Sequence, residues 1–171
     1  ASDPDITGMA LTALYPYRDQ EAVAAAAEEA FACLSAMQHD NGTFASGGSE
    51  CSESCAWVIV AATAWGINPD TDARFIKNGN SVVDALLAHY LSDSATFQHI
   101  SGAGSNAMAT DQSCYGLVAY DRLFSGKTAL FDQLNLGNSA YMNLSCDVMS
   151  VPKELEMQGL HFGLFLPWVQ I

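Results

Sequence analysis

The chain has 171 residues, which is enough for one domain with a substantial hydrophobic core. Six Lys and Arg residues stand against nineteen Asp and Glu residues, so the net charge is −13. This charge argues against binding to nucleic acid or to anionic membrane surfaces. Half of the residues are hydrophobic and only 15% are charged, a composition that excludes a disordered chain.

The first two predicted helices cover residues 5–14 and 19–37, and Pro16 separates them. The second of these helices has an apolar stripe, while Glu28 and Glu29 lie off that stripe. We therefore expect it to be amphipathic, with one face on the core and the other in water.

A third helix is predicted over residues 52–66. Ser52 is its candidate N-cap, Glu53 lies in the first turn, and Gly66 marks its end. No charged residue occurs between Glu53 and Asp70, so this helix has no solvated face and must be enclosed on all sides. It is too short to cross a bilayer, which needs about 20 apolar residues, and we expect no membrane insertion.

The later part of the chain repeats this alternation. A helical turn is expected over residues 73–77, a second amphipathic helix over 81–91, and a third apolar helix over 111–120. Turn-forming segments rich in Gly and Asn separate these elements, and no strand pattern competes. The predicted fold class is all-α.

Three blocks of sequence resemble one another, at residues 5–14, 53–62 and 111–120. Each opens with an acid, has small residues at its third and fourth positions, a bulky residue at its fifth and Ala at its ninth. The spacings of 48 and 58 residues are typical of stacked helix pairs. We expect the apolar helices to form an inner layer and the amphipathic ones an outer layer.

The run Gln38-x-x-x-Gly42-x-Phe44 follows the first amphipathic helix. A Gln at this place can bridge backbone groups at a helix end, while Gly permits the turn and the aromatic ring contacts the neighbouring repeat. The run resembles the Gln-Trp repeat of squalene and other terpenoid cyclases, with Phe in place of Trp.

That resemblance covers about residues 3–132 and implies the α/α toroid of terpenoid cyclases, protein prenyltransferase β subunits and cobalamin carriers of the intrinsic factor type. The sequence is most similar to toroid segments of surface proteins from Gram-positive bacteria, which implies an extracellular or cell-surface location. Such rings close with five or six helix pairs, whereas two pairs and a third inner helix are seen here. We therefore expect a partial α/α toroid over residues 1–133, an open arc or a fragment of a longer protein, followed by a non-repeat segment over 134–171.

The segment from Asp3 to Thr7 is similar to the Asp-x-Asp-Asp-Thr signature of class II terpenoid cyclases. The resemblance implies that Asp5 is a general acid that protonates an alkene or an epoxide. The last Asp of the signature is replaced by Ile6, and the acid that opens each repeat has a simpler explanation as a helix cap worth about 1 kcal/mol. Both roles for Asp5 stay open.

Three acids at equivalent helix starts are expected to lie together at one end of the inner layer, where they would orient a cation or a polar ligand. Aromatic residues on the inner helices would line the same cavity, although core packing explains them equally well. The predicted ligand-binding residues are Asp3, Asp5, Glu53, Trp57, Asp111 and Tyr115.

No metal site or cofactor is predicted. The five cysteines form no Cys-x-x-Cys pair and the four histidines are scattered. Protein prenyltransferases hold zinc with Asp, Cys and His, and no Asp-x-Cys followed by a matching His occurs here. We expect His39 and His99 to be solvated in loops and His89 to lie on the outer surface of a helix.

The preferred hypothesis is a non-catalytic module of a secreted or surface protein that binds a small molecule or a protein through the ends of its inner helices. The first alternative is an enzyme similar to isoprenoid cyclases with Asp5 as the acid. The second is a purely structural fragment without a ligand.

Overall fold

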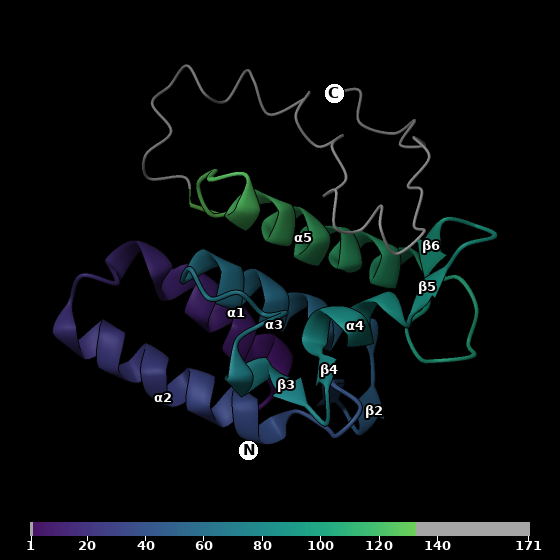
Figure 1. The fold of residues 1–171 in the computed structure, drawn as a ribbon, viewed down its shortest axis with the longest axis horizontal. Helices are drawn as coiled ribbons and strands as arrows, with labels where there is room; N and C mark the ends of the chain where they lie inside the picture. The colour runs from purple at the N-terminus through teal and green to yellow at the C-terminus, as the bar shows by residue number, and fades with distance from the viewer. Residues whose placement is uncertain (1, 133–171) are drawn as a thin grey trace.

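The computed structural model describes residues 2–132, and Figure 1 shows their arrangement. The chain forms five α-helices, two short 3₁₀ helices (η) and six two-residue strands over this range. In chain order they are α1 (Pro4–Leu14), η1 (Tyr15–Tyr17), α2 (Glu21–Met37), β1 (Ala45–Ser46), β2 (Ser49–Glu50), α3 (Ser52–Ala64), η2 (Ala73–Phe75), β3 (Ile76–Lys77), β4 (Asn80–Ser81), α4 (Val82–Leu87), β5 (Tyr90–Leu91), β6 (Thr96–Phe97) and α5 (Ala107–Phe124).

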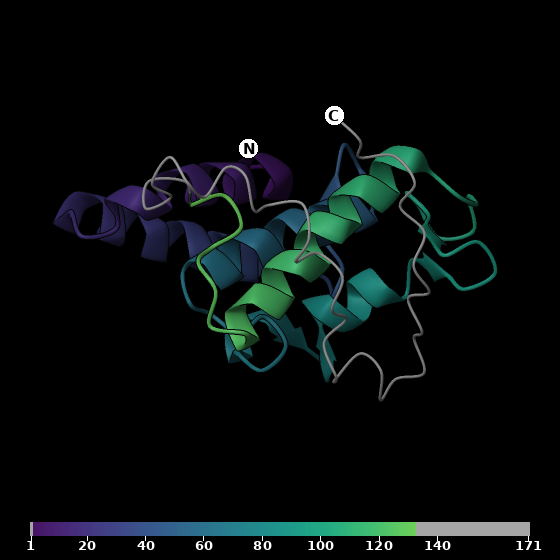
Figure 2. The ribbon, with the colours of Figure 1, turned by 90° about the horizontal axis from the view of Figure 1, so that it is seen from above.

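Helix α3 is the centre of the core. Every residue of this helix except Trp57 is buried, which confirms the predicted enclosure. Helices α1, α4 and α5 contact α3, and α2 packs on α1 (Figures 1 and 2). Two glycines bring backbones close together: a Cβ at Gly8 would lie 2.7 Å from the carbonyl oxygen of Trp57, and one at Gly116 would lie 3.1 Å from Cα of Ala56.

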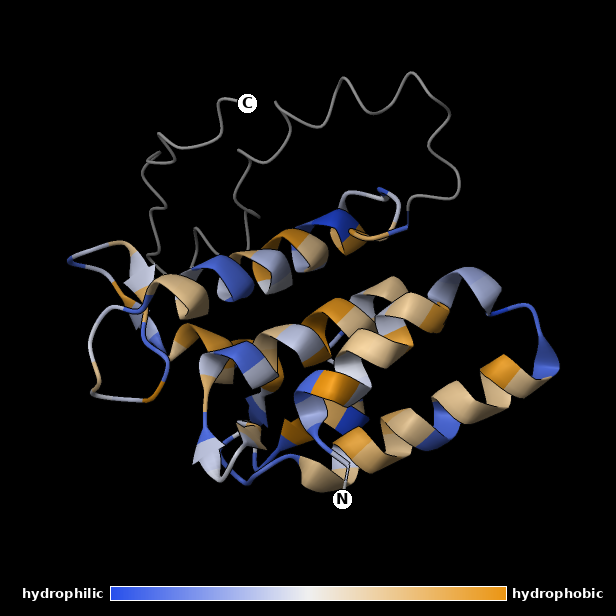
Figure 3. Cartoon of the chain, turned by 180° about the vertical axis from the view of Figure 1, so that it is seen from behind, coloured by the Kyte–Doolittle hydropathy of each residue, from blue (hydrophilic) through white to orange (hydrophobic). Residues whose placement is uncertain are grey.

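The neighbours of α3 are less enclosed than the repeat predicted. Ile6 and Met9 of α1 and Met108 of α5 are exposed, because within residues 2–132 these helices contact the core through one side only. Polar and apolar residues alternate around α2 and α5, as Figure 3 shows. Within residues 2–132, α3 is therefore the only fully enclosed helix.

The prediction of an all-α fold, a partial toroid built only of helix pairs, is wrong. The described residues are 54% helical and 11% strand, with three small antiparallel sheets that pair β1 with β2, β3 with β4 and β5 with β6. Tight turns close the first two hairpins at Gly47-Gly48 and Asn78-Gly79, all four residues with positive φ. Strands of two residues carry no alternating pattern, so the sequence showed their turns but not the strands.

Among the helices, α4 and α5 differ most from their predicted ranges. Helix α4 ends at Leu87 rather than at residue 91, because Tyr90–Leu91 pairs with β6. Helix α5 begins at Ala107, where the side chain of Asn106 caps it, one turn before Asp111. The predicted C-terminal segment, residues 134–171, lies outside the described residues.

The Gln38 motif forms the contacts predicted for it. Nε2 of Gln38 donates hydrogen bonds to the carbonyl oxygens of Gly42 at 3.0 Å and of Phe75 at 2.9 Å. Gly42 has φ of +83°, and a Cβ there would lie 2.6 Å from the carbonyl oxygen of Ser81. Phe44 is fully buried. The glutamine thus connects the end of α2 to the following unit, at η2.

We expect Gln38→Ala to lower the free energy of unfolding by about 2 kcal/mol, because it leaves two buried carbonyl groups without their donor. Oε1 of Gln38 has no partner among the described residues, which keeps the loss at the lower end of the range for two hydrogen bonds. Gln20→Ala is the control, since Gln20 is exposed and its side chain makes no capping bond to α2, and a change within about 0.5 kcal/mol is expected. Equal losses for the two variants in urea unfolding would contradict the bridging role.

Candidate functional site

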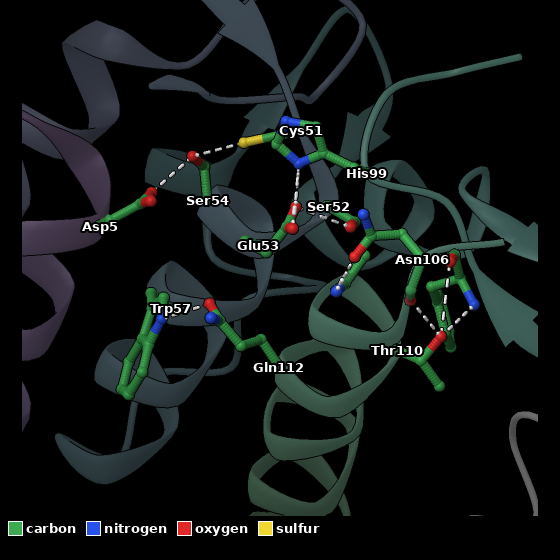
Figure 4. A network of polar contacts seen from close by, with 12 residues as sticks. Asp5, Cys51, Ser52, Glu53, Ser54, Trp57, His99, Asn106, Thr110 and Gln112 are labelled. Carbon is green, nitrogen blue, oxygen red and sulfur yellow. Dashed lines mark hydrogen bonds and ion pairs between the residues drawn. The ribbon is translucent and has the colours of Figure 1, made fainter. Parts of the chain in front are cut away.

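The polar groups gather where α1 and α3 begin, and Figure 4 shows them at close range. Helix α1 contributes Asp5, the start of α3 contributes Cys51, Glu53 and Ser54, and the loop after β6 contributes His99. Cys51 rather than the predicted Ser52 is the N-cap of α3, and its side chain makes no capping bond. The thiol is therefore available for other contacts.

A chain of hydrogen bonds runs from Cys51 to Asp5. Oγ of Ser54 donates to Oδ1 of Asp5 at 2.5 Å and lies 3.1 Å from Sγ of Cys51. A hydroxyl carries one proton, so once Ser54 donates to Asp5 it accepts from the thiol. The order is Cys51 S–H, Ser54 O–H, Asp5 carboxylate, and it joins α3 to α1.

The two aspartates of the Asp3-Pro4-Asp5 segment have opposite environments. Asp3 is the N-cap of α1, and its pKa is lowered chiefly by the hydroxyl of Ser46, which donates to Oδ2 at 2.6 Å. The pKa of Asp5 is raised, mainly because this carboxyl is half-buried, with further contributions from the negative charges of Asp3 and Glu53. The capping role expected for Asp5 therefore belongs to Asp3, and Asp5 keeps its proton to higher pH than an ordinary aspartate.

The side chains of Glu53 and His99 lie in direct contact. Nδ1 of His99 lies 2.9 Å and 2.8 Å from the two carboxylate oxygens of Glu53. Glu53 is buried and also accepts a hydrogen bond from Oγ of Ser52 at 3.1 Å, whereas the His99 side chain is 43% exposed. The backbone N–H of Ser52 donates to the carbonyl oxygen of His99 at 3.2 Å, which fixes this loop against the start of α3.

Cys51, Glu53 and His99 together form a candidate metal centre. One Cys sulfur, one carboxylate oxygen and one imidazole nitrogen lie within 4.8 Å of one another. These are the donor types that zinc prefers, and ligand atoms around a tetrahedral zinc ion lie about 3 to 4 Å apart. Sequence reasoning missed this cluster because Cys51-x-Glu53 is no metal signature by itself, and the third residue follows 46 positions after Glu53.

The aromatic candidates lie beside this cluster and not in it. Nε1 of Trp57 donates to Oε1 of Gln112 at 2.8 Å, and the rings of Trp57, Tyr115 and Phe131 pack with centroids 6.0 to 6.4 Å apart. Asp111 is exposed and accepts a hydrogen bond from the Tyr115 hydroxyl at 2.7 Å. The structure thus divides the predicted ligand-binding residues into a polar group and an aromatic group. The polar group is Asp3, Asp5 and Glu53, and the aromatic group is Trp57, Asp111 and Tyr115.

A cavity of about 340 Å³ lies near the cluster, lined by Glu50 and His89 among others. Hydrogen bonds from Asn41 and His39 lower the pKa of Glu50 to about 2, so this carboxylate stays charged. His89 is buried, at 4% exposure, and not on the helix surface as predicted; burial lowers its pKa. Asp5 does not line this cavity.

Comparison with protein-family models, with curated proteins and with solved structures finds no match for this chain. Within residues 2–132, none of the helices has the length and hydrophobicity needed to span a membrane.

We expect Asp3→Asn and Asp5→Asn to change the pH dependence of stability in opposite directions. A lowered pKa means that Asp3 stabilises the fold above the unfolded-state pKa of about 4 and loses this effect as the pH falls. The loss of unfolding free energy in Asp3→Asn should therefore be larger at pH 7 than at pH 3. A raised pKa means that Asp5 stabilises the fold below that unfolded-state pKa and loses this effect as the pH rises. Between pH 4 and 7, the free energy of unfolding of Asp5→Asn should therefore rise relative to that of wild type.

The measurement is denaturant unfolding of both variants at intervals between pH 3 and 7. Each variant is the control for the other, because the two replace the same group two positions apart in the chain. The same sign of slope change in both would show that the environments assigned to Asp3 and Asp5 are wrong.

Proposed function

We propose that this chain is a non-catalytic binding module that holds a divalent transition-metal ion, zinc in the first place, through Cys51, Glu53 and His99, and takes its ligand at that ion. The observation that supports it is the meeting of sulfur, oxygen and nitrogen donors from two separate segments within 4.8 Å. The thiol and the carboxylate are buried while the imidazole reaches the surface. Three protein ligands leave a fourth tetrahedral position for a donor atom of the ligand.

The surrounding residues support this function. Binding of zinc requires a thiolate, and the Ser54–Asp5 chain gives the thiol proton a path to the half-buried carboxylate of Asp5. Ser52 orients the Glu53 carboxylate by donating to Oε2, a role that supporting residues commonly have around zinc. The ion would bind between the imidazole of His99 and the carboxylate of Glu53, and it would supply positive charge to attract the ligand.

The negative charge of the chain favours binding of a cation, rather than an anion, at the cluster of Cys51, Glu53 and His99. Glu50 and Asp5 lie near the cluster, and the net charge of −13 raises the local concentration of cations. The resemblance to surface-protein segments supports a location outside the cell, with a small molecule or a protein as the ligand of the ion.

Titration with Co²⁺ under reducing conditions tests the proposal. We expect a thiolate-to-cobalt charge-transfer band and a higher melting temperature with Zn²⁺, because an ion bound only by the folded state stabilises it. Cys51→Ser should abolish the charge-transfer band, and His99→Ala should weaken the affinity more than about tenfold.

Cys33→Ser is the matched control, since Cys33 is a free thiol on α2 outside the cluster. It should leave the band and the affinity unchanged. Absence of the band in wild type, or its loss in Cys33→Ser, would overturn the assignment of this site.

A further inference from the structure

A second cavity, of about 280 Å³, lies at the opposite ends of the helices from the metal cluster. Its walls come from the C-terminal ends of α1, α3 and α5, including Tyr15, Trp65 and Leu123. Arg18, Arg122 and Lys127 also line it, and none of the described residues that line it is an Asp or a Glu. This cavity is therefore positive in a strongly negative chain.

This cavity has a larger share of the basic residues than the composition of residues 2–132 would lead one to expect. Residues 2–132 contain five Lys and Arg residues and sixteen Asp and Glu residues. Three of those five cations line this one cavity, and none of the sixteen acids does. In a chain of this charge, a cationic residue would be expected to lie beside a carboxylate.

The arginines of the cavity differ from the arginine outside it. Arg74 pairs with the carboxylates of Asp72 and Glu28. In the part of the chain that the structure describes, neither Arg18 nor Arg122 forms an ion pair with a carboxylate. The positive charge of these two guanidinium groups is thus not neutralised by the described acids.

Both guanidinium groups are nevertheless held in place. Arg18 stacks on the ring of Tyr15, 4.2 Å from its centroid, and donates one hydrogen bond to the Tyr15 carbonyl oxygen. Arg122 donates from Nε to the Thr128 carbonyl oxygen at 2.7 Å and from one terminal nitrogen to Oγ1 of Thr128 at 2.9 Å. A guanidinium has five N–H donors, so each arginine keeps donors that these contacts do not use.

The ends of the helices explain only part of this arrangement. Carbonyl groups at a helix C-terminus attract cations, which accounts for a basic residue beside α1 and another beside α5. It does not account for a hollow between them with aromatic and aliphatic walls at Trp65 and Leu123. Fixed guanidinium groups around an open space have the geometry that recognises carboxylate and phosphate.

We infer that this cavity binds the oxyanion group, carboxylate or phosphate, of a small molecule, with the guanidinium groups of Arg18 and Arg122 as its cationic contacts. This site is separate from the metal cluster and does not depend on it.

Isothermal titration calorimetry with inorganic phosphate and with acetate, at constant ionic strength set by sodium chloride, tests the inference and separates the two oxyanions. We expect saturable binding of at least one of them to wild type. Arg122→Gln and Arg18→Gln should each weaken binding by about tenfold or more. Arg74→Gln changes the net charge equally and should leave the affinity within about twofold, because Arg74 lies outside the cavity.

Cys51→Ser should bind the oxyanion with the same affinity as wild type. Failure of the metal site and failure of the oxyanion site can therefore be told apart. Thermal unfolding of each variant shows whether it folds, and Arg18→Gln carries the test if loss of the Thr128 contact prevents Arg122→Gln from folding. Absence of saturable binding of both oxyanions to wild type, or equal weakening by Arg74→Gln, would overturn the inference and leave the cations as charge compensation for the helix ends.

Discussion

The enclosure of α3 is the constraint on which the rest of the structure depends. This helix has no polar face, so α1, α4 and α5 must cover it. Gly8 and Gly116 allow the backbones of α1 and α5 to approach it closely enough to exclude water. Burial of each large apolar side chain here is worth about 1.5 to 3 kcal/mol, and a one-turn shift of either neighbour would place a side chain against the α3 backbone.

This packing also explains why the two candidate sites have opposite charge. The C-terminal ends of α1, α3 and α5 meet at one cavity, and the starts of α1 and α3 are joined by the Ser54–Asp5 hydrogen bond, so these helices run in the same direction. Helix dipoles that point the same way favour acids at the start and cations at the end. Asp3, Asp5 and Glu53 lie near the starts of α1 and α3, whereas Arg18 and Arg122 lie near the ends of α1 and α5. An antiparallel bundle would have mixed the two signs at each end.

Features encoded by neighbouring residues were predictable from the sequence, and features that depend on distant pairing were not. The burial of α3 and the Gln38 bridge follow from local composition and from a short motif. Asp111 was expected at the start of the last helix, but it lies one turn inside α5, because Asn106 caps this helix and starts it at Ala107. The hairpins could not be predicted because strands of two residues have no periodicity. The approach of His99 to Cys51 and Glu53 depends on one of these hairpins, the pairing of β5 with β6.

The overlooked strands are what position the candidate site. After β5 and β6 pair, the N–H of Gln98 donates to the carbonyl oxygen of His89, and the N–H of Phe97 donates to Oγ1 of Thr110 on α5. The hairpin is thereby anchored on both sides, and His99, the next residue along, meets the start of α3 through its carbonyl oxygen and its ring. Without this pairing the chain between α4 and α5 would have no fixed register, and the imidazole would have no reason to face Glu53. The β5–β6 hairpin therefore positions His99, while helix α3 supplies the buried residues that His99 meets.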